Sequence, residues 1–153
     1  MKSLFSLVLA LIPTTLLGQA PASHEDQLLH MHSELIRAHV EGRVDLWMSL
    51  EAQEYTSLNG GRITFPTMAA REEQRAAYLQ GASFEVYRDL REPIVRVSDD
   101  GSLGWLMAEV QVSGTLLDQD GNRVPFHDVW AWVEFYEHTG EGWRLTGNAS
   151  NRR

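Results

Sequence analysis

Two glutamates lie within segments that are otherwise apolar and aromatic. Glu109 is in WLMAEVQVSG, and Glu134 is in DVWAWVEFYE, where Trp130, Trp132 and Glu134 alternate with apolar residues. A carboxyl group buried against an indole ring has a raised pKa, and two neighbouring carboxyl groups push their pKa values apart. Such groups suit general acid–base catalysis. Glu109 is therefore the first candidate for a general base; alternatively, both glutamates form structural ion pairs, Glu134 with Arg144.

Two of the six histidines share one side of a predicted helix. His32 and His39 are seven positions apart, which is about two helical turns. His32 could act with Glu109 as an acid–base pair; alternatively, it is a boundary residue beside the apolar stripe. The chain has no Cys and no H-x-x-x-H spacing, so we predict no metal site and no cofactor. It also lacks nucleophile motifs and phosphate-binding glycine loops.

The elements that must position these residues follow from hydrophobic periodicity. Leu28, Met31 and Leu35 recur at helical spacing within residues 23–42, and shorter helices are predicted over 44–50 and 66–80. Asn59-Gly60 is a strong turn signal and predicts a hairpin. From residue 84 onwards, β-rich runs alternate with turns, and Pro93 interrupts the first run. Helices followed by a four-stranded antiparallel meander predict an α+β fold.

A turn at Asp120-Gly121 predicts the register of the two longest strands. A two-residue type I′ turn there places Gln119 opposite Asn122. The predicted pairs on one face are then Trp105–Tyr136, Met107–Glu134, Glu109–Trp132 and Gln111–Trp130. The other face is aliphatic, with Leu106 opposite Phe135. A slip of one residue would exchange the two faces of one strand.

The last hairpin extends the aromatic-polar face. Matching like residues pairs Glu134 with Thr146, Trp132 with Asn148 and Trp130 with Ser150. A few polar groups among aromatic rings are typical of a ligand pocket. They are equally typical of a protein interface, so a homodimer contact through this face is the alternative. Weaker candidates for the pocket are Tyr87, on a bordering strand, and Arg62, after the hairpin turn.

Composition limits the possible partners and suggests export. The chain has 153 residues, 43% of them hydrophobic, and a net charge of −8. This acidity argues against a nucleic-acid partner. Lys2, an apolar run from Leu4 to Leu17 and the sequence Ala20-Pro21-Ala22 predict a signal peptide over residues 1–22. One domain over 23–153 would remain, secreted or periplasmic and without a membrane partner; a retained membrane anchor is the alternative.

Several segments resemble one known superfamily. The residues that carry the resemblance are EGRVDLWMSL, SLNGGRI, VSDDGSLGWL and EGWRLTGNASN, within residues 25–151. They are similar to nuclear transport factor 2-like proteins, most closely the branch of SnoaL-type polyketide cyclases and ketosteroid isomerases. The resemblance implies a cone: a curved sheet that wraps around helices, encloses a pocket and commonly forms dimers.

The resemblance also bears on single residues. Trp143-Arg144-Leu145 matches the W-x-[IVL] that opens the last strand in this superfamily. In the related association domain of a calmodulin-dependent kinase, a pocket arginine follows that Trp by seven positions. Ser150 stands there in this chain and cannot replace an arginine as an anion binder.

Three functions are therefore open. The first is an exported protein that binds a small hydrophobic or amphipathic molecule inside the cone. The second is a cofactor-free isomerase, dehydratase or cyclase in which Glu109 or a helix histidine is the general base. The isomerases combine an acidic base with oxyanion donors, and Tyr55 and Asp89 match that pattern only loosely. The third is a homodimeric interaction module without a ligand.

Overall fold

The fold consists of three helices and one strongly curved sheet. A computed structural model describes residues 22–153, so the predicted signal peptide lies outside the described residues except for Ala22. In chain order the elements are α1 (His24–Val40), α2 (Val44–Leu50), β1 (Glu51–Asn59), β2 (Arg62–Thr64), α3 (Met68–Gly81), β3 (Ala82–Asp89), β4 (Ile94–Val97), β5 (Leu103–Leu117), β6 (Arg123–Thr139) and β7 (Gly142–Arg152). The three predicted helices and the predicted hairpin of β1 and β2 are confirmed. None of the helices in residues 22–153 is long and apolar enough to cross a membrane.

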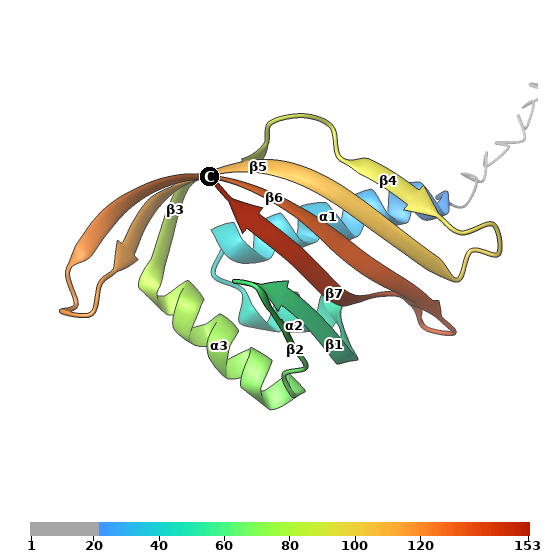
Figure 1. The fold of residues 1–153 in the computed structure, drawn as a ribbon, viewed down its shortest axis with the longest axis horizontal. Coiled ribbons are helices and arrows are strands. Elements are labelled where there is room, and N and C mark those ends of the chain that lie inside the picture. Colours follow the sequence, from blue (N-terminus) through green and yellow to red (C-terminus); the bar gives the residue numbers. More distant parts are fainter. Residues whose placement is uncertain (1–21) are drawn as a thin grey trace, which may run out of the picture.

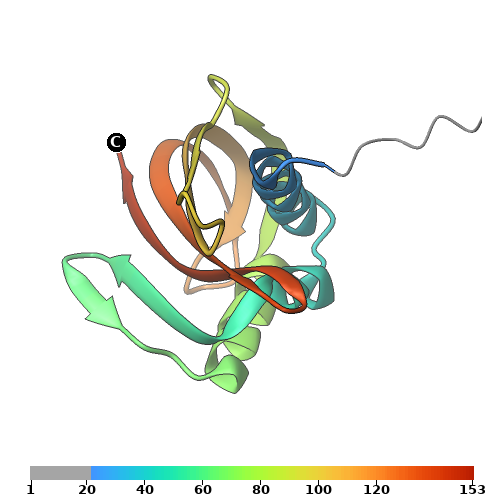
Figure 2. The same ribbon diagram turned by 90° about the vertical axis from the view of Figure 1, so that its right-hand side faces the viewer.

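The sheet is mixed rather than a simple meander. Its strand order is β2-β1-β7-β6-β5-β3, and β4 pairs separately with β5. β1 runs parallel to β7, a pairing that sequence periodicity did not predict. Figures 1 and 2 show the sheet curling around α1, with α2 and α3 beside the open side of the curve. The α+β cone that the resemblance implied is therefore confirmed.

Helix α1 lies across the concave face of the sheet. Ser23 begins it with a capping box, in which the backbone N–H of Asp26 donates to the Ser23 hydroxyl and the backbone N–H of Ser23 donates to the Asp26 carboxylate. The buried stripe of the helix contains Leu28 and Leu35, as the spacing predicted, and also His32 and His39. Both histidines are thus fixed between the helix and the sheet.

Tight strand packing needs a glycine in β5. Gly114 pairs with Phe84 of β3, next to a bulge in that strand. A Cβ at Gly114 would lie 1.9 Å from the backbone oxygen of Ser83, so no larger residue fits without moving the strand. This close approach brings β3 against β5 and helps to close one side of the cone.

The predicted register between β5 and β6 is wrong by one residue. Leu106 pairs with Glu134, Ala108 with Trp132 and Val110 with Trp130. The tryptophans of β6 therefore share a face with the aliphatic residues of β5, not with Glu109 and Gln111. The opposite, convex face combines Trp105, Met107, Val133 and Phe135, together with Glu109 and Gln111.

The physical reason is the loop that joins the two strands. The backbone N–H of Asp118 donates to the carbonyl of Asn122 at 2.9 Å, so the loop contains three residues rather than two. Gly121 has a φ of 81° and takes the left-handed position of such a loop. The Asp118 carboxylate accepts hydrogen bonds from the backbone N–H groups of Asp120 and Asn122, at 2.9 and 2.8 Å. One extra loop residue exchanges the faces of β5 relative to β6.

The register of the last hairpin is shifted by two residues and keeps its faces. Trp132 pairs with Ser150 and Glu134 with Asn148, while the predicted pair of Glu134 with Thr146 is wrong. Between the turn and Tyr136 the shift is one residue, with Tyr136 opposite Leu145, and a bulge between Phe135 and Tyr136 adds the second residue. Because the shift is even, the tryptophan face of β6 continues into Asn148 and Ser150, as predicted.

Candidate functional site

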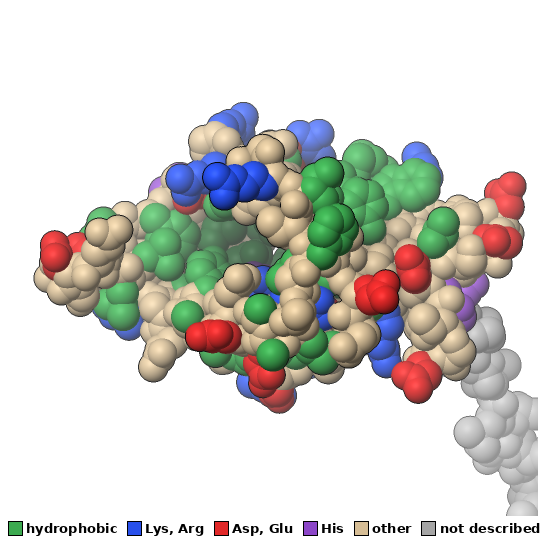
Figure 3. Space-filling view, turned by 60° about the horizontal axis from the view of Figure 1, so that its bottom comes forward, with side chains coloured by type: hydrophobic (Ala, Val, Ile, Leu, Met, Phe, Trp, Pro, Cys, Tyr) green, Lys and Arg blue, Asp and Glu red, His purple; other side chains and the backbone are tan. Residues whose placement is uncertain are grey.

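A cavity lies on the concave face of the sheet, between the strands and the helices. Its volume is about 420 Å³. Aromatic side chains form much of its wall: Trp47, Tyr55, Tyr78, Tyr87, Phe126, Trp130 and Trp132. The polar or charged lining residues are Ser57, Asn59, Arg75, Asp128, Glu134, Asn148, Ser150 and Arg152, together with His39. Figure 3 shows the molecule hollowed on one side, with hydrophobic side chains inside the hollow.

Most of the predicted ligand-binding residues line this cavity. They are Trp130, Trp132, Glu134, Asn148, Ser150 and Tyr87. Ser57 of β1 also lines the cavity, and its hydroxyl donates to the side-chain oxygen of Asn148 at 3.3 Å. The parallel pairing of β1 with β7 therefore places Ser57, Asn148 and Ser150 together as a polar strip beside the aromatic wall.

Four predicted residues do not line the cavity: Glu109, Gln111, Arg62 and His32, of which His32 is described below with Glu134. Glu109 lies on the convex face, where it forms an ion pair with Arg91 and a longer one, at 3.7 Å, with Arg153. Gln111 lies on the same face and accepts a hydrogen bond from Arg88 at 3.0 Å. Both placements follow from the corrected register.

Arg62 is the third residue outside the cavity. It lies on β2 and lines a separate depression beside the hairpin turn. The corrected register also excludes the suggested acid–base pair of Glu109 and His32. Glu109 lies on the convex face of the sheet, whereas His32 contacts Glu134 on the concave face.

Glu134 is the centre of a buried polar cluster. Its side chain is 1% exposed. Its Oε1 contacts Nδ1 of His32 at 2.9 Å and accepts from Nε1 of Trp132 at 2.8 Å, and its Oε2 accepts from the Tyr136 hydroxyl at 2.6 Å. On the other side of the ring, Nε2 of His32 contacts Oδ1 of Asp89 at 3.1 Å. His32 thus joins α1 to β3 and β6.

The cluster keeps His32 charged. Burial alone lowers the pKa of its imidazole, but the hydrogen bonds and charges of Asp89 and Glu134 together outweigh burial and raise this pKa to about 10. At neutral pH both ring nitrogens therefore carry protons, and each donates to one carboxylate. His32 is 2% exposed and does not line the cavity. Its direct effect is to fix Glu134, and through Glu134 the indole of Trp132.

His39 is in the opposite protonation state and is neutral. Burial lowers the pKa of its imidazole to about 4, so the ring is neutral at pH 7. Its Nδ1 donates to the carbonyl of Leu35 at 2.7 Å, and the ring packs at a tilt against Trp47 and Tyr87, with centroid distances of 3.9 and 4.9 Å. Nε2 is then an unprotonated acceptor, and no described residue hydrogen-bonds to it. Because His39 lines the cavity, this nitrogen is a possible base there.

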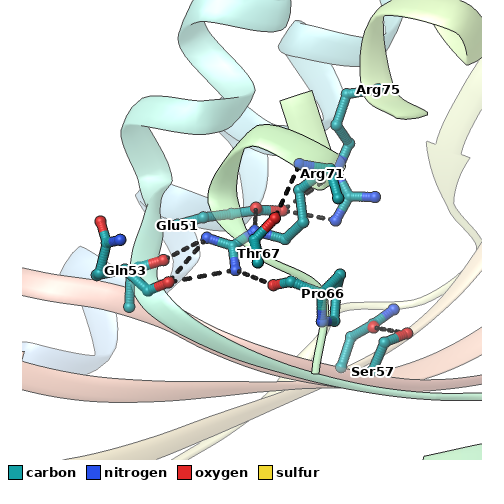
Figure 4. A network of polar contacts seen from close by, with 10 residues as sticks. Glu51, Gln53, Ser57, Pro66, Thr67, Arg71 and Arg75 are labelled. Carbon is teal, nitrogen blue, oxygen red and sulfur yellow. Dashed lines mark hydrogen bonds and ion pairs between the residues drawn. The ribbon is translucent and has the colours of Figure 1, made fainter. Parts of the chain in front are cut away.

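A second buried cluster lies where α3 meets β1. The Glu51 side chain is fully buried and contacts two arginines of α3, Nε of Arg71 at 2.8 Å and Nη2 of Arg75 at 2.7 Å. Arg71 is also fully buried, and its terminal nitrogens donate to the backbone carbonyls of Ala52, Gln53 and Pro66. Figure 4 shows both arginines directed at Glu51. Arg75 alone of these three lines the cavity.

Sequence reasoning did not select Arg75, Trp47 or Tyr78. Arg71 and Arg75 are four residues apart in MAAREEQRAAYL, which places them on one helix face. This spacing was an available signal. A pair of arginines on a helix is nevertheless usually solvated, and the buried partner, Glu51, is twenty residues away from Arg71 in the sequence.

Comparison with known proteins supports the fold. No protein-family model matches the chain, and no curated protein does. Many solved structures match the chain. The chain is similar to an NTF2-like protein from Cytophaga hutchinsonii, with a TM-score of 0.69 and 10% identity over 86% of this chain and 100% of that one. The chain has the NTF2-like fold.

Two further solved structures are similarly distant in sequence. A candidate calcium/calmodulin-dependent kinase II association domain from Exiguobacterium sibiricum has a TM-score of 0.68 and 15% identity over 89% of this chain and 98% of that one. A candidate dehydratase of the NTF2-like family from Streptomyces avermitilis has a TM-score of 0.65 and 12% identity over 83% and 94%. At such low identity the likeness concerns the NTF2-like fold alone.

In this NTF2-like cone, the cavity wall favours some kinds of chemistry over others. Flat aromatic surfaces and a polar strip suit a planar ligand that carries a few hydrogen-bonding groups. No group of His, Asp and Glu side chains within residues 22–153 has the arrangement of a metal site. Nε2 of His39 is a group of the cavity wall that could accept a proton.

Proposed function

We propose that this protein binds a small hydrophobic or amphipathic molecule in the cavity of the cone. The observation that carries the proposal is the cavity itself, whose volume of about 420 Å³ lies within the range of small-molecule sites. An NTF2-like cone filled by its own side chains would need no ligand, but here seven aromatic side chains border open space.

The buried clusters support this proposal. The cluster of His32, Asp89 and Glu134 fixes the indole of Trp132, and the cluster of Glu51, Arg71 and Arg75 joins α3 to β1. Such clusters keep the wall in one conformation before any ligand arrives. A preformed site binds more tightly, because less side-chain freedom is lost on binding.

A neutral fluorescent probe tests the proposal. N-phenyl-1-naphthylamine should bind the wild type with enhanced emission, and Trp130→Leu should weaken binding at least about fivefold, which corresponds to about 1 kcal/mol. Trp105→Leu is the matched control, because Trp105 lies on the convex face. If the wild type does not bind the probe, or if the two variants weaken binding equally, the cavity is not the binding site.

A second candidate function is a cofactor-free enzyme that transfers protons. The specific observation in its favour is Nε2 of His39, an unprotonated acceptor in the wall of the cavity. One of the fold neighbours is described as a candidate dehydratase and another as a candidate ketosteroid isomerase. If the wild type turns over activated ketones, His39→Asn should abolish turnover and Glu109→Gln should not change it. Absence of wild-type turnover across such ketones would exclude this candidate for that class of substrate.

Two features of the proposal concern the whole protein. Export rests on the sequence of residues 1–22 and predicts an extracytoplasmic protein that begins at Ser23; a retained Met1 would contradict it.

The other feature is self-association as a homodimer. The convex face exposes Trp105, Met107 and Phe135, and two fold neighbours are described as candidate association domains.

A further inference from the structure

The cluster of Glu51, Arg71 and Arg75 holds one more positive charge than negative. Glu51 is the only carboxylate in ionic contact with these arginines among the described residues, and it contacts both. The other bonds of Arg71 go to backbone carbonyls, which carry no net charge. An excess charge in a poorly solvated place is costly unless an anion or water compensates it.

Arg75 brings part of this charge to the cavity wall, because its side chain lines the cavity as well as a second depression beside β2. Nε and Nη2 of Arg75 both donate to Oε1 of Glu51, at 3.2 and 2.7 Å. Because a guanidinium group is planar, Nη1 then points away from Glu51. No described residue accepts a hydrogen bond from Nη1. The side chain is 18% exposed and lines the cavity.

An aromatic surface lies beside the same group. The guanidinium carbon of Arg75 lies 4.4 Å from the ring centroid of Trp47 and 5.8 Å from that of Tyr55. Stacking on these rings holds the guanidinium in place and reduces its hydration, so a hydrogen bond to an anion is stronger there than in water.

The other charged groups of the cavity already have partners. Glu134 is hydrogen-bonded by charged His32 and by Trp132 and Tyr136. Asp128 lies 3.6 Å from Arg152, and that arginine side chain is 64% exposed. Among the described arginines that line the cavity, Arg75 is therefore the partly buried one with a free donor, whereas Arg152 is mostly exposed.

From these observations we propose that the ligand is a planar aromatic acid whose carboxylate is bound by Nη1 of Arg75. The ring system would lie against the tryptophans and tyrosines of the wall, and its acidic group would reach the end where α3 meets β1. The inference rests on the proposed function, since it names the ligand class of the same cavity.

A matched pair of compounds tests the inference. 2-Naphthoate and 2-naphthamide have the same ring and nearly the same shape, but only the first is an anion at neutral pH. Isothermal titration calorimetry with the wild type should show about tenfold or more preference for the acid, as expected for a charge-assisted hydrogen bond. Arg75→Gln should remove the preference with little change in amide affinity, and Arg75→Lys should keep part of it. Arg88→Gln, on the convex face, is the control for loss of one distant charge and should keep the full preference.

The neutral probe separates failure of this inference from failure of the proposed function. If N-phenyl-1-naphthylamine binds in a Trp130-dependent manner while the wild type binds acid and amide equally, or binds neither, the inference is overturned and the binding function stands. The inference is also overturned if Arg75→Gln binds the probe normally and retains the preference for the acid. If the wild type binds no probe and neither naphthyl compound, both proposals are overturned.

Discussion

At the scale of single residues, two histidines of one helix have opposite protonation states. His32 lies between two carboxylates, which raise its pKa to about 10. His39 is surrounded by aromatic rings and donates to a backbone carbonyl, and burial lowers its pKa to about 4. Both side chains are on the buried stripe of α1. Helix periodicity therefore placed them correctly, but the carboxylates of β3 and β6 determine the charge of His32, and burial among aromatic rings determines that of His39.

The raised pKa of His32 predicts how stability depends on pH. The folded protein holds this proton up to about pH 10, whereas the unfolded chain loses it near the ordinary value of 6.5. The stabilisation is therefore complete below about pH 6.5 and declines by up to about 1.4 kcal/mol per pH unit as the pH rises towards 10. Urea unfolding from about pH 6.5 to about pH 9.5 should show this decline for the wild type and not for His32→Gln. Equal slopes in the two proteins would contradict the assignment.

At the scale of elements, the loop between β5 and β6 decides which residues share a face. Asp118 and Gly121 form a three-residue connection instead of the predicted two-residue turn. The extra residue moves Glu109 to the convex face and places Val110 beside Trp130. The two carboxylates that suggested catalysis, Glu109 and Glu134, therefore lie on opposite faces of the sheet. Glu134, and not Glu109, contacts His32.

A glycine pair tests this loop. Gly121→Ala forces a residue with a side chain into the left-handed region and should lower the free energy of unfolding by about 1–2 kcal/mol. Gly140→Ala in the β6–β7 turn is the control, because a Cβ added at either glycine would have no neighbour within 4 Å and only Gly121 has a left-handed φ. Urea unfolding of both variants gives the comparison. Equal losses would mean that backbone conformation at Gly121 does not stabilise the hairpin.

At the scale of the whole molecule, the two faces of the sheet have different surroundings. The helices cover the concave face and leave the cavity between them and the strands. The convex face has no covering element within residues 22–153, and there Trp105, Met107 and Phe135 are 37–39% exposed next to Ile94 at 43%. An exposed group of this kind is typical of a protein interface. The sequence left two alternatives for the tryptophan face of β6, a ligand pocket and a dimer contact. In the structure this face lines the cavity. We therefore expect a dimer contact on the opposite, convex face.

The convex face predicts a homodimer that a single charge disrupts. Phe135→Glu places a carboxylate among Trp105 and Val133 and should make the protein monomeric, because a buried unpaired charge is costly at an interface. Phe65→Glu is the control, since Phe65 is 75% exposed and precedes α3. Size-exclusion chromatography with light scattering measures the mass of each. A monomeric wild type, or a dimer that survives Phe135→Glu, would contradict this interface.

The sequence alone determined the local structure and the part of the aromatic wall that β6 contributes. Helix spacing, capping residues and turn signals depend on near neighbours, so α1, α2, α3 and the first hairpin were predictable. The alternation in DVWAWVEFYE placed Trp130, Trp132 and Glu134 on one face regardless of register, since alternate residues of a strand always share a face.

Only the tertiary structure decided which residues meet across that face. Register depends on the exact length of a loop, and an error of one residue is enough to exchange Glu109 for Val110. The cavity, the charge of His32 and the position of Arg75 depend on contacts between residues far apart in the chain, such as His32 with Glu134 and Glu51 with Arg75. No local pattern encodes such contacts, because they form only when the sheet curves around the helices.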